Sequence, residues 1–365
     1  MTNLKFDNFN FNVDEQAFCI PNKAMEDVRL IVVDAEGGSI RHDMFSNLNE
    51  YLRDDDEIVM NNVGISRSRL SGVTDSGDQV DICFLVHDPA DSSSWEVVIL
   101  SESYPPESGR FTLADGAVIG ELKGKVAPFD GAYWLERNRY QGYRGRIKIN
   151  LDQAGLRAVL NARGLYMHPW YTDINELPED ILNPSTTTLG GGALLSEPSR
   201  RMTPELLSAC TDNGKRMTEV SIELAFAWRP ADANDNLDNY SMNPEHIRVS
   251  AEAAQRINKA VSENRRLITV GTGPTRVLES LPMPVGSVDT HTDIFISPGY
   301  DFKYSGGLLT NLHVPMSTHV IMASAFGGRE LIMQACREAA DRGYHFGIHG
   351  DSMLIFNAQT PQAYQ

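Results

Sequence analysis

The spacing of apolar and polar positions changes several times along the chain, and each change predicts a different kind of element. Residues 28–34 and 57–63 are short apolar runs rich in β-branched side chains, which indicates buried strands. Glycines at 36–38 predict a turn after the first run, and residues 44–52 predict a short helix. From 70 to 148 short alternating runs are separated by turn-rich stretches, which is typical of a small antiparallel barrel or sandwich.

Helical periodicity returns in the second half of the chain. It covers residues 151–164, 203–214 and 250–265, and Ser250 stands where an N-terminal cap is expected. Between 217 and 356 strand-like runs alternate with helical ones, which predicts an α/β layer with a mainly parallel sheet.

Together these patterns predict a large α/β domain with a mainly parallel sheet and a small antiparallel β-barrel inserted into it. The predicted large domain is discontinuous and consists of residues 1–69 together with 151–365. The predicted barrel domain consists of residues 70–150. A chain of 365 residues, 41% of them hydrophobic, is long enough for one large core and a smaller one.

The net charge of −17, from 32 Lys and Arg against 49 Asp and Glu, argues against a general nucleic-acid coat because it repels polyanions. It does not exclude a local basic groove, since cations interleaved with aromatic rings hold phosphates and stack bases. The alternative is a strand pair whose charges lie in water. The densest such stretch contains Arg137, Arg139, Arg144, Arg146 and Lys148 with Tyr133, Trp134, Tyr140 and Tyr143.

Several features indicate a cytoplasmic protein without a membrane partner or a metal. No window offers the roughly 20 uninterrupted apolar residues of a membrane helix, and the acidic N-terminal stretch lacks the apolar core of an export signal. The four cysteines are scattered and form no CxxC pair, which indicates neither a zinc site nor a disulfide framework. His345 and His349 lie near Asp351, but intervening glycines argue against one helix presenting both rings, so no metal is expected.

The first stretch that suggests chemistry is the glycine turn at 271–275, which follows a predicted strand and leads into a helix from about Arg276. Free backbone N–H groups at such a helix start hold carboxylates or phosphates. Thr272 adds a hydroxyl, Arg276 a bidentate fork and Glu279 a carboxylate one turn later. A purely structural turn is the alternative. The spacing matches neither a GxGxxG fingerprint nor a P-loop, so nucleoside triphosphate chemistry is not supported.

The second such stretch covers residues 290–330. Residues 290–302 are strand-like, and residues 308–314 predict a strand in which Asn311 and His313 share one face. Ser317 or Thr318 is expected to cap a helix beginning at about His319, and another helix is expected to open at residues 327–330. A His beside a capped helix start can act as an acid or base or hold an anion, although a satisfied structural His is the alternative.

At these residues the chain resembles the S-adenosylmethionine:tRNA ribosyltransferase-isomerase family of queuosine biosynthesis. The strongest block is 292–355, with TDIFISPGYDF, LLTNLHVPMSTHVIMASAFGGRE and GDSMLI. VGTGPTRVLES at 270–280 and YSMNPEHIRV at 240–249 also match, the latter including Glu245. The resemblance spans nearly the whole chain, and it implies an α/β domain with an inserted β-barrel.

The resemblance implies transfer and isomerisation of the ribosyl group of S-adenosylmethionine, with release of adenine and methionine. The family's acceptor is the aminomethyl group of 7-aminomethyl-7-deazaguanine in tRNA. This chemistry needs a base beside the sulfonium, and aromatic faces or acids suit that cation. Implied catalytic candidates are His313, Asp293 and Glu279. Implied S-adenosylmethionine-binding candidates are Thr272, Arg276, Tyr300, Asn311, Ser317, Thr318, Phe326, Arg329 and Asp351.

Several segments depart from the family pattern. A family histidine is replaced by Arg201, a glycine-rich stretch with another histidine is replaced by SIELAFAW at 221–228, and Asn61-Asn62 begins a segment that lacks an acid and an arginine. The PSTTTLGGG region also replaces a family motif. Candidates for the acceptor region are Arg200, Arg201 and Glu245.

These regional changes lead to three hypotheses. The first is that S-adenosylmethionine chemistry is retained while the acceptor, possibly a small molecule, or the fate of the ribosyl group differs. The second is a divergent but true tRNA-modifying enzyme. The third is a catalytically silent protein that binds S-adenosylmethionine or a nucleoside. The sequence gives no indication of the oligomeric state.

Overall fold

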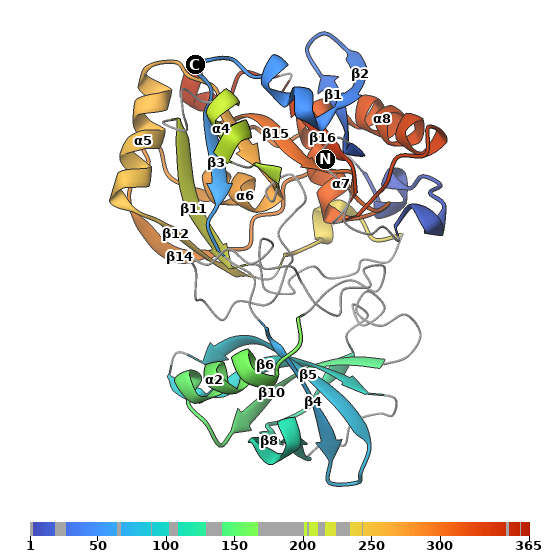
Figure 1. Cartoon of the computed structure of the whole chain (residues 1–365), viewed down its shortest axis with the longest axis vertical. Coiled ribbons are helices and arrows are strands. Elements are labelled where there is room, and N and C mark those ends of the chain that lie inside the picture. Colours follow the sequence, from blue (N-terminus) through green and yellow to red (C-terminus); the bar gives the residue numbers. More distant parts are fainter. Residues whose placement is uncertain are drawn as a thin grey trace. The chain divides into compact units, whose positions relative to one another are not determined.

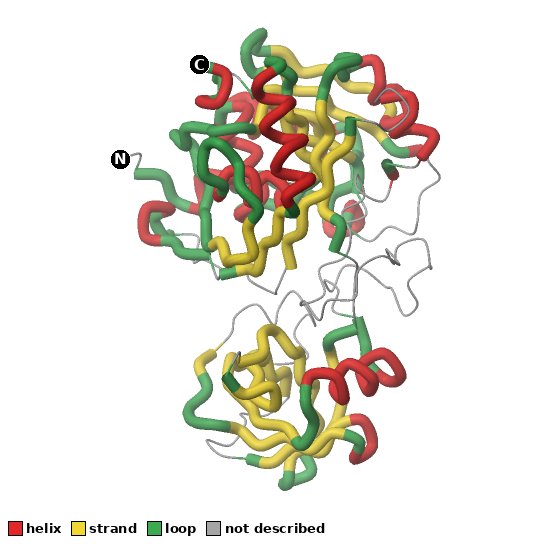
Figure 2. The backbone as a smooth tube through the Cα atoms, turned by 90° about the vertical axis from the view of Figure 1, so that its left-hand side faces the viewer, coloured by secondary structure: helices red, strands yellow, loops and turns green. Residues whose placement is uncertain are grey.

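The chain forms two compact units, which are described separately (Figures 1 and 2). The large unit consists of residues 1–62, 195–222 and 231–365, and the small unit of residues 63–194 and 223–230. The computed structural model describes residues 3–18, 27–63, 67–88, 90–101, 109–128, 141–166, 201–202, 204–210, 216–223, 234–242, 244–347, 350–357 and 359–365.

Within its described residues, the large unit is built on a nine-stranded sheet of order β14-β12-β11-β3-β13-β15-β16-β1-β2. Its strands are β1 (Arg29–Asp34), β2 (Ser39–Met44), β3 (Glu57–Asn61), β11 (Met217–Glu223), β12 (Glu245–Val249), β13 (Leu267–Val270), β14 (Val288–Thr292), β15 (Ser305–Asn311) and β16 (Ser352–Phe356). Strands β11, β3, β13 and β15 run parallel, and β16 runs parallel to β1 but antiparallel to β15. The predicted mainly parallel sheet is confirmed.

The described helical segments of this unit lie between and beside the strands. The α-helices are α4 (Pro204–Cys210), α5 (Ala251–Ser262), α6 (Thr272–Ser280), α7 (Thr318–Gly327) and α8 (Arg329–Asp341). The 3-10 helices are η1 (Phe6–Phe9), η2 (Glu15–Ala17), η4 (Phe45–Glu50), η8 (Leu237–Asn239) and η9 (Gln362–Tyr364).

The sheet is covered on both faces, as its continuous apolar runs require. On β1, Ile31 and Val33 face the core formed with α7, α8 and η1, whereas Leu30 and Val32 face the core formed with η4 and α4. On β13, Ile268 and Val270 face the η4 and α4 core, so Thr269 between them faces the other side. Helix α6 lies on that side, the α7 and α8 face, because its Thr275 shares a 2.7 Å hydroxyl hydrogen bond with Thr269. The orange and red helices beside the sheet in Figure 1 show this arrangement.

Most predicted helix starts are confirmed. The Ser250 hydroxyl caps α5 by accepting from the backbone N–H of Ala253 at 3.0 Å, and Ser317 caps α7. Gly328, with φ 77°, precedes α8 in a conformation that favours glycine. Helix α6 begins at Thr272 rather than near Arg276, because Gly271 at φ 93° turns the chain directly out of β13.

Two strand predictions need correction. The strand-like segment 290–302 forms a strand only up to Thr292, where β14 ends its pairing with β12. The predicted strand 308–314 is β15, which begins earlier and ends at Asn311, so the expectation that Asn311 and His313 share a strand face is wrong. His313 lies in the connection between β15 and α7.

The small unit contains a closed six-stranded antiparallel barrel. Its ring runs β6-β5-β4-β7-β8-β10 and is closed by pairing of β6 with β10, with β9 added beside β10. The elements are β4 (Arg69–Thr74), β5 (Gln79–Asp88), β6 (Asp91–Ser101), β7 (Arg110–Leu113), η5 (Ala114–Gly116), β8 (Val118–Leu122), β9 (Ala127–Pro128), β10 (Gln141–Ile149) and α2 (Gln153–Arg163). Helix α2 contributes Leu156 and Leu160 to the barrel core. The predicted β-barrel is confirmed.

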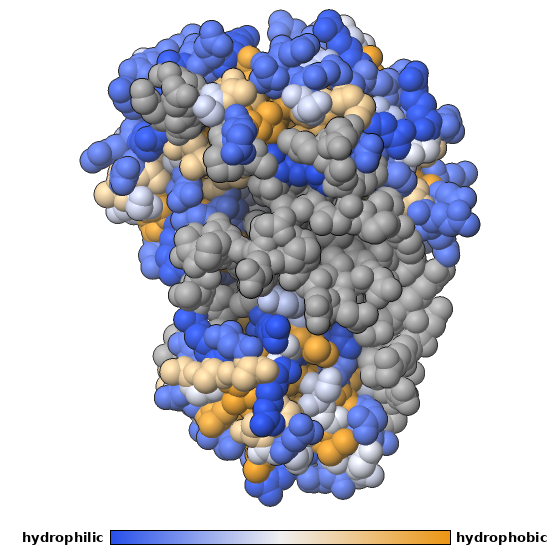
Figure 3. Space-filling view, viewed as in Figure 1, coloured by the Kyte–Doolittle hydropathy of each residue, from blue (hydrophilic) through white to orange (hydrophobic). Residues whose placement is uncertain are grey.

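The described surface of the large unit is mainly polar, as expected for a chain in which 22% of the residues are charged. In the view of Figure 3, hydrophilic side chains predominate on the described surface of the large unit. Among the described helices, none is both long and apolar enough to cross a membrane.

Candidate functional site

The parallel strands bring chemically interesting segments to one edge of the large sheet. Because β11, β3, β13 and β15 run in the same direction, their carboxyl ends meet at the same edge. Helix α6 starts after β13, and His313 and helix α7 follow β15. Ligands of open α/β sheets bind at such edges, where strand ends meet helix starts.

Arg276 and Glu245 form a buried ion pair beside this edge. The Arg276 side chain is 5% exposed and that of Glu245 is 3% exposed, and the guanidinium Nη1 donates to the Glu245 carboxylate. Arg276 Nε also donates to the carbonyl oxygen of Ile294 at 3.2 Å, and Nη2 donates to that of Thr292 at 3.4 Å. Burial raises the pKa of Glu245 to about 7, against the opposing attraction of Arg276. The fold therefore joins two sequence-predicted site residues from α6 and β12.

Replacing Arg276 by lysine tests how much of this contact depends on the guanidinium fork. A lysine keeps the positive charge, but its ammonium group cannot reproduce the planar set of hydrogen bonds that the guanidinium donates to Glu245 and to two backbone carbonyls. The free energy of unfolding should therefore fall by about 2 kcal/mol. Chemical denaturation measures the change. Arg337→Lys, on the exposed face of α8, is the matched control and should change stability by less than about 0.5 kcal/mol. Equal effects of the two substitutions would contradict the assignment.

His313 is stacked on a second histidine, His319 of α7. Their ring centroids are 4.7 Å apart and the planes differ by 21°. His313 Nε2 shares a 2.6 Å hydrogen bond with the Thr310 hydroxyl. Burial and the neighbouring His319 hold the pKa of His313 well below its usual value, and burial together with the charge of Arg276 lowers that of His319 to about 4. Both imidazoles are therefore uncharged at neutral pH. The sequence predicted His319 only as the start of a helix. A spacing of six residues from His313 does not indicate that the two rings lie together.

Glu279 is fully buried, and its carboxylate accepts hydrogen bonds mainly from backbone N–H groups. Oε1 accepts from the N–H groups of Tyr304 at 3.2 Å and Ser305 at 2.9 Å, and from the Ser305 hydroxyl at 2.7 Å. Oε2 accepts from the N–H of Lys303 at 2.6 Å and from the Tyr300 hydroxyl at 3.4 Å. Burial and Glu279 raise the pKa of Tyr300 well above its usual value. This geometry favours a role for Glu279 in fixing the start of β15, rather than the predicted catalytic role.

Asp351 has a similar anchoring geometry. Its side chain is fully buried, and it accepts from the backbone N–H groups of Arg29 and His345, each at 2.8 Å. The Arg29 guanidinium lies 3.3 Å from the same carboxylate. Within the described residues no group of three or more metal-ligating side chains could hold a metal ion, and His349 lies outside them.

Several other predicted binding residues are engaged in folding contacts. The Ser317 hydroxyl donates to the carbonyl of Val314 at 2.8 Å and caps α7. Phe326 is 1% exposed and packs against Phe302 with ring centroids 4.1 Å apart, so its face is not open to a sulfonium. Arg329 pairs with Glu330 and donates to the carbonyl of Asn8 at 3.4 Å.

The remaining candidates lie nearer the surface or at the strand end. Asp293 is exposed just after β14, while Thr272 and Thr318 are partly buried at the first positions of α6 and α7. Asn311 is 2% exposed at the end of β15, opposite Ser352 of β16. Tyr300 lines a small cavity of about 370 Å³.

Two of the segments that depart from the family pattern lie side by side. The Asn61 carboxamide donates to the carbonyl of Ile222 at 3.2 Å and accepts from its N–H at 3.0 Å. The Ser221 hydroxyl donates to Asn62 at 2.7 Å. Ile222 is completely buried. Arg201, a candidate for the acceptor region, is 6% exposed, and Arg200 lies outside the described residues.

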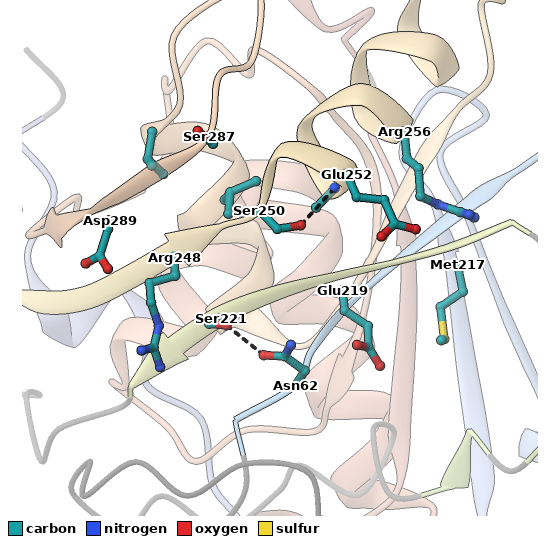
Figure 4. A pocket seen from close by; sticks show the side chains of 13 residues that line it. Asn62, Met217, Glu219, Ser221, Arg248, Ser250, Glu252, Arg256, Ser287 and Asp289 are labelled. Carbon is teal, nitrogen blue, oxygen red and sulfur yellow. Dashed lines mark hydrogen bonds between the residues drawn. The ribbon is translucent and has the colours of Figure 1, made fainter.

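A cavity of about 950 Å³ opens beside the hydrogen bond between Asn62 and Ser221 (Figure 4). Asn62 and Ser221 line it together with side chains from β12, from the first turns of α5 and from β14. Its walls carry both signs of charge, including Arg248, Arg256 and Glu219. The predicted donor-site residues are not among those that line it.

The predicted basic stretch of the barrel is charge-paired in its described part. On β10, Arg144 pairs with Glu96, Arg146 lies 3.4 Å from Asp88, and Lys148 lies 2.8 Å from Asp91. The intervening Tyr143 is 3% exposed and belongs to the barrel core. The described residues therefore favour the alternative of a strand with solvated, paired charges over a phosphate-binding groove; Tyr133, Trp134, Arg137, Arg139 and Tyr140 lie outside them.

Comparison with known proteins places the chain in a family. The sequence model described as queuosine biosynthesis protein matches residues 6–355. The chain belongs to this family. The predicted family is thereby confirmed, and the names of the relatives below confirm the predicted class of transferase-isomerases.

Individual relatives agree with this assignment over their full length. The S-adenosylmethionine:tRNA ribosyltransferase-isomerase of Desulfitobacterium hafniense is 32% identical over 357 residues, covering 96% of this chain and 100% of the relative. The protein of the same name from Carboxydothermus hydrogenoformans is 31% identical with the same coverage. The crystal structure of S-adenosylmethionine tRNA ribosyltransferase from Thermotoga maritima has 21% identity and a TM-score of 0.51, covering 96% of this chain and 100% of that one. That likeness shows the shared fold.

Proposed function

We propose that this protein uses S-adenosylmethionine as a ribosyl donor, transferring and isomerising the ribosyl group while adenine and methionine leave. The observation that carries the proposal is that the Arg276–Glu245 ion pair and His313 are linked through His319, which stacks on His313 and feels the charge of Arg276, in a chain of this family. The uncharged imidazole of His313 does not repel a cationic sulfonium. An uncharged imidazole can also take the acidified proton beside the sulfonium.

We further propose that the acceptor is a small molecule. Support comes from the altered segments, which meet in the Asn61–Ile222 and Asn62–Ser221 contacts beside a cavity large enough for a nucleobase-sized ligand. The paired cations of the barrel and the net charge of −17 also favour a small acceptor over a polyanion.

The second candidate is true tRNA modification, making epoxyqueuosine from 7-aminomethyl-7-deazaguanine tRNA. The names of the full-length relatives favour it.

A single assay separates these functions. We expect purified protein to release adenine and methionine from S-adenosylmethionine when given free 7-aminomethyl-7-deazaguanine or a related small amine, as measured by chromatography. Release that requires the same base within tRNA would establish the second candidate. Absence of adenine under every condition would contradict both enzymatic functions and favour a binding protein, which calorimetry with S-adenosylmethionine would then detect.

A further inference from the structure

His319 stacks on His313 and has no role among the candidates that the sequence predicted. It occupies the second position of α7, directly after Thr318, and its ring covers one face of His313. His313 is also held by a hydrogen bond: its Nε2 lies 2.6 Å from the hydroxyl of Thr310, the penultimate residue of β15. His313 is thus held between a hydrogen bond at one ring nitrogen and a stacked ring on its face.

We propose that His319 is a positioning residue that keeps the His313 imidazole uncharged and fixed in one plane, so that it meets the cationic donor as a neutral base. This inference rests on the proposed use of S-adenosylmethionine for its catalytic meaning. The stacking and its electrostatic consequence are independent of that use.

Three features make a charged imidazole unfavourable at this position. The stacked ring of His319, at a centroid distance of 4.7 Å, covers one face of His313 and excludes water that would solvate a charged imidazole. Arg276 of α6 adds a permanent positive charge that acts on His319. The N-terminus of α7 carries a partial positive charge of its own, because its first backbone N–H groups lack intrahelical acceptors. Glu245, the carboxylate that could compensate, is already paired with Arg276.

The charge of the His313 imidazole determines whether it can act as a base. A protonated His313 could not accept a proton and would repel a sulfonium. Holding the pair neutral keeps His313 in its unprotonated form over the whole physiological pH range. The stack also limits rotation of the ring, which preserves the direction of its two ring nitrogens.

The test compares His319→Ala with His319→Phe. Phenylalanine still covers the ring of His313, whereas alanine exposes it to water and removes the neighbouring imidazole. We expect the pKa of His313 to rise toward its ordinary value by about one unit or more in H319A, and to change by less than about half a unit in H319F. Histidine-selective isotope labelling and NMR titration measure this, with the His313 resonance identified by His313→Gln.

Activity provides the second readout. In H319A the acidic limb of the pH profile of kcat for adenine release should move to higher pH by the same amount, with about threefold lower activity at pH 6 relative to pH 8. H319F should keep the wild-type profile. An unchanged His313 pKa in H319A, or a loss of kcat that is uniform with pH, would overturn the inference. If the wild-type protein releases no adenine, the NMR titration still decides the inference, so the two failures are distinguishable.

Discussion

Replacement of Glu279 by alanine is expected to lower the free energy of unfolding by about 4 kcal/mol, because two buried and one half-buried backbone N–H groups lose their acceptor. Bulk water does not reach this carboxylate in the wild type, since Glu279 and Ser305 are completely buried. The affected groups lie directly before and at the start of β15, a central strand that pairs with both β13 and β16. Chemical denaturation followed by circular dichroism measures the loss.

Two further variants make this result specific. Glu279→Gln keeps one carbonyl oxygen but turns an amide toward the other donors, so about half of the loss is expected. Glu50→Ala, at the exposed end of η4, is the control for removing one carboxylate and should change stability by less than about 0.5 kcal/mol. If E279A were as stable as the wild type but inactive, the predicted catalytic role would be restored.

The layout of the fold could be predicted from the sequence because local patterns determine it. Runs such as 28–34 and 267–271 are apolar on both sides, and only a sheet covered on both faces buries them. Ser250 and Ser317 mark helix starts through their hydroxyls, and both serve as caps. The strand ends were less predictable: β15 stops at Asn311 although the apolar alternation continues, since pairing with β16 ends at Ser352.

The candidate site was predictable only in part, because polar side chains in one motif serve different purposes. Arg276 and Glu279 are three residues apart on α6, but their contacts differ. Arg276 forms an ion pair with Glu245, whereas the Glu279 carboxylate accepts from backbone N–H groups at the start of β15. No local pattern distinguishes a carboxylate that anchors backbone from one that faces a ligand. The His313–His319 stack depends on a turn between β15 and α7 that brings the rings together, so it emerges only in three dimensions.

His313→Gln is expected to lower kcat for adenine release by about 10²–10⁴-fold, the usual contribution of a general acid or base. Glutamine can still form a hydrogen bond with the Thr310 hydroxyl, as the imidazole does at 2.6 Å, so the fold should be retained. It cannot accept a proton at neutral pH. The KM for S-adenosylmethionine should change little, because an uncharged imidazole is replaced by an uncharged amide.

The control for this variant is His42→Gln on β2, at the far edge of the sheet, where the ring bonds Tyr344 at 2.9 Å and Glu338 at 3.1 Å. It should retain kcat within about twofold. A His313→Gln enzyme with unchanged kcat would assign the base elsewhere, and Asp293, exposed immediately after β14, would be the next residue to replace. Since its carboxylate carries a charge, Asp293→Asn would then be expected to raise KM for the cationic donor as well as lower kcat, and steady-state kinetics separate the two effects.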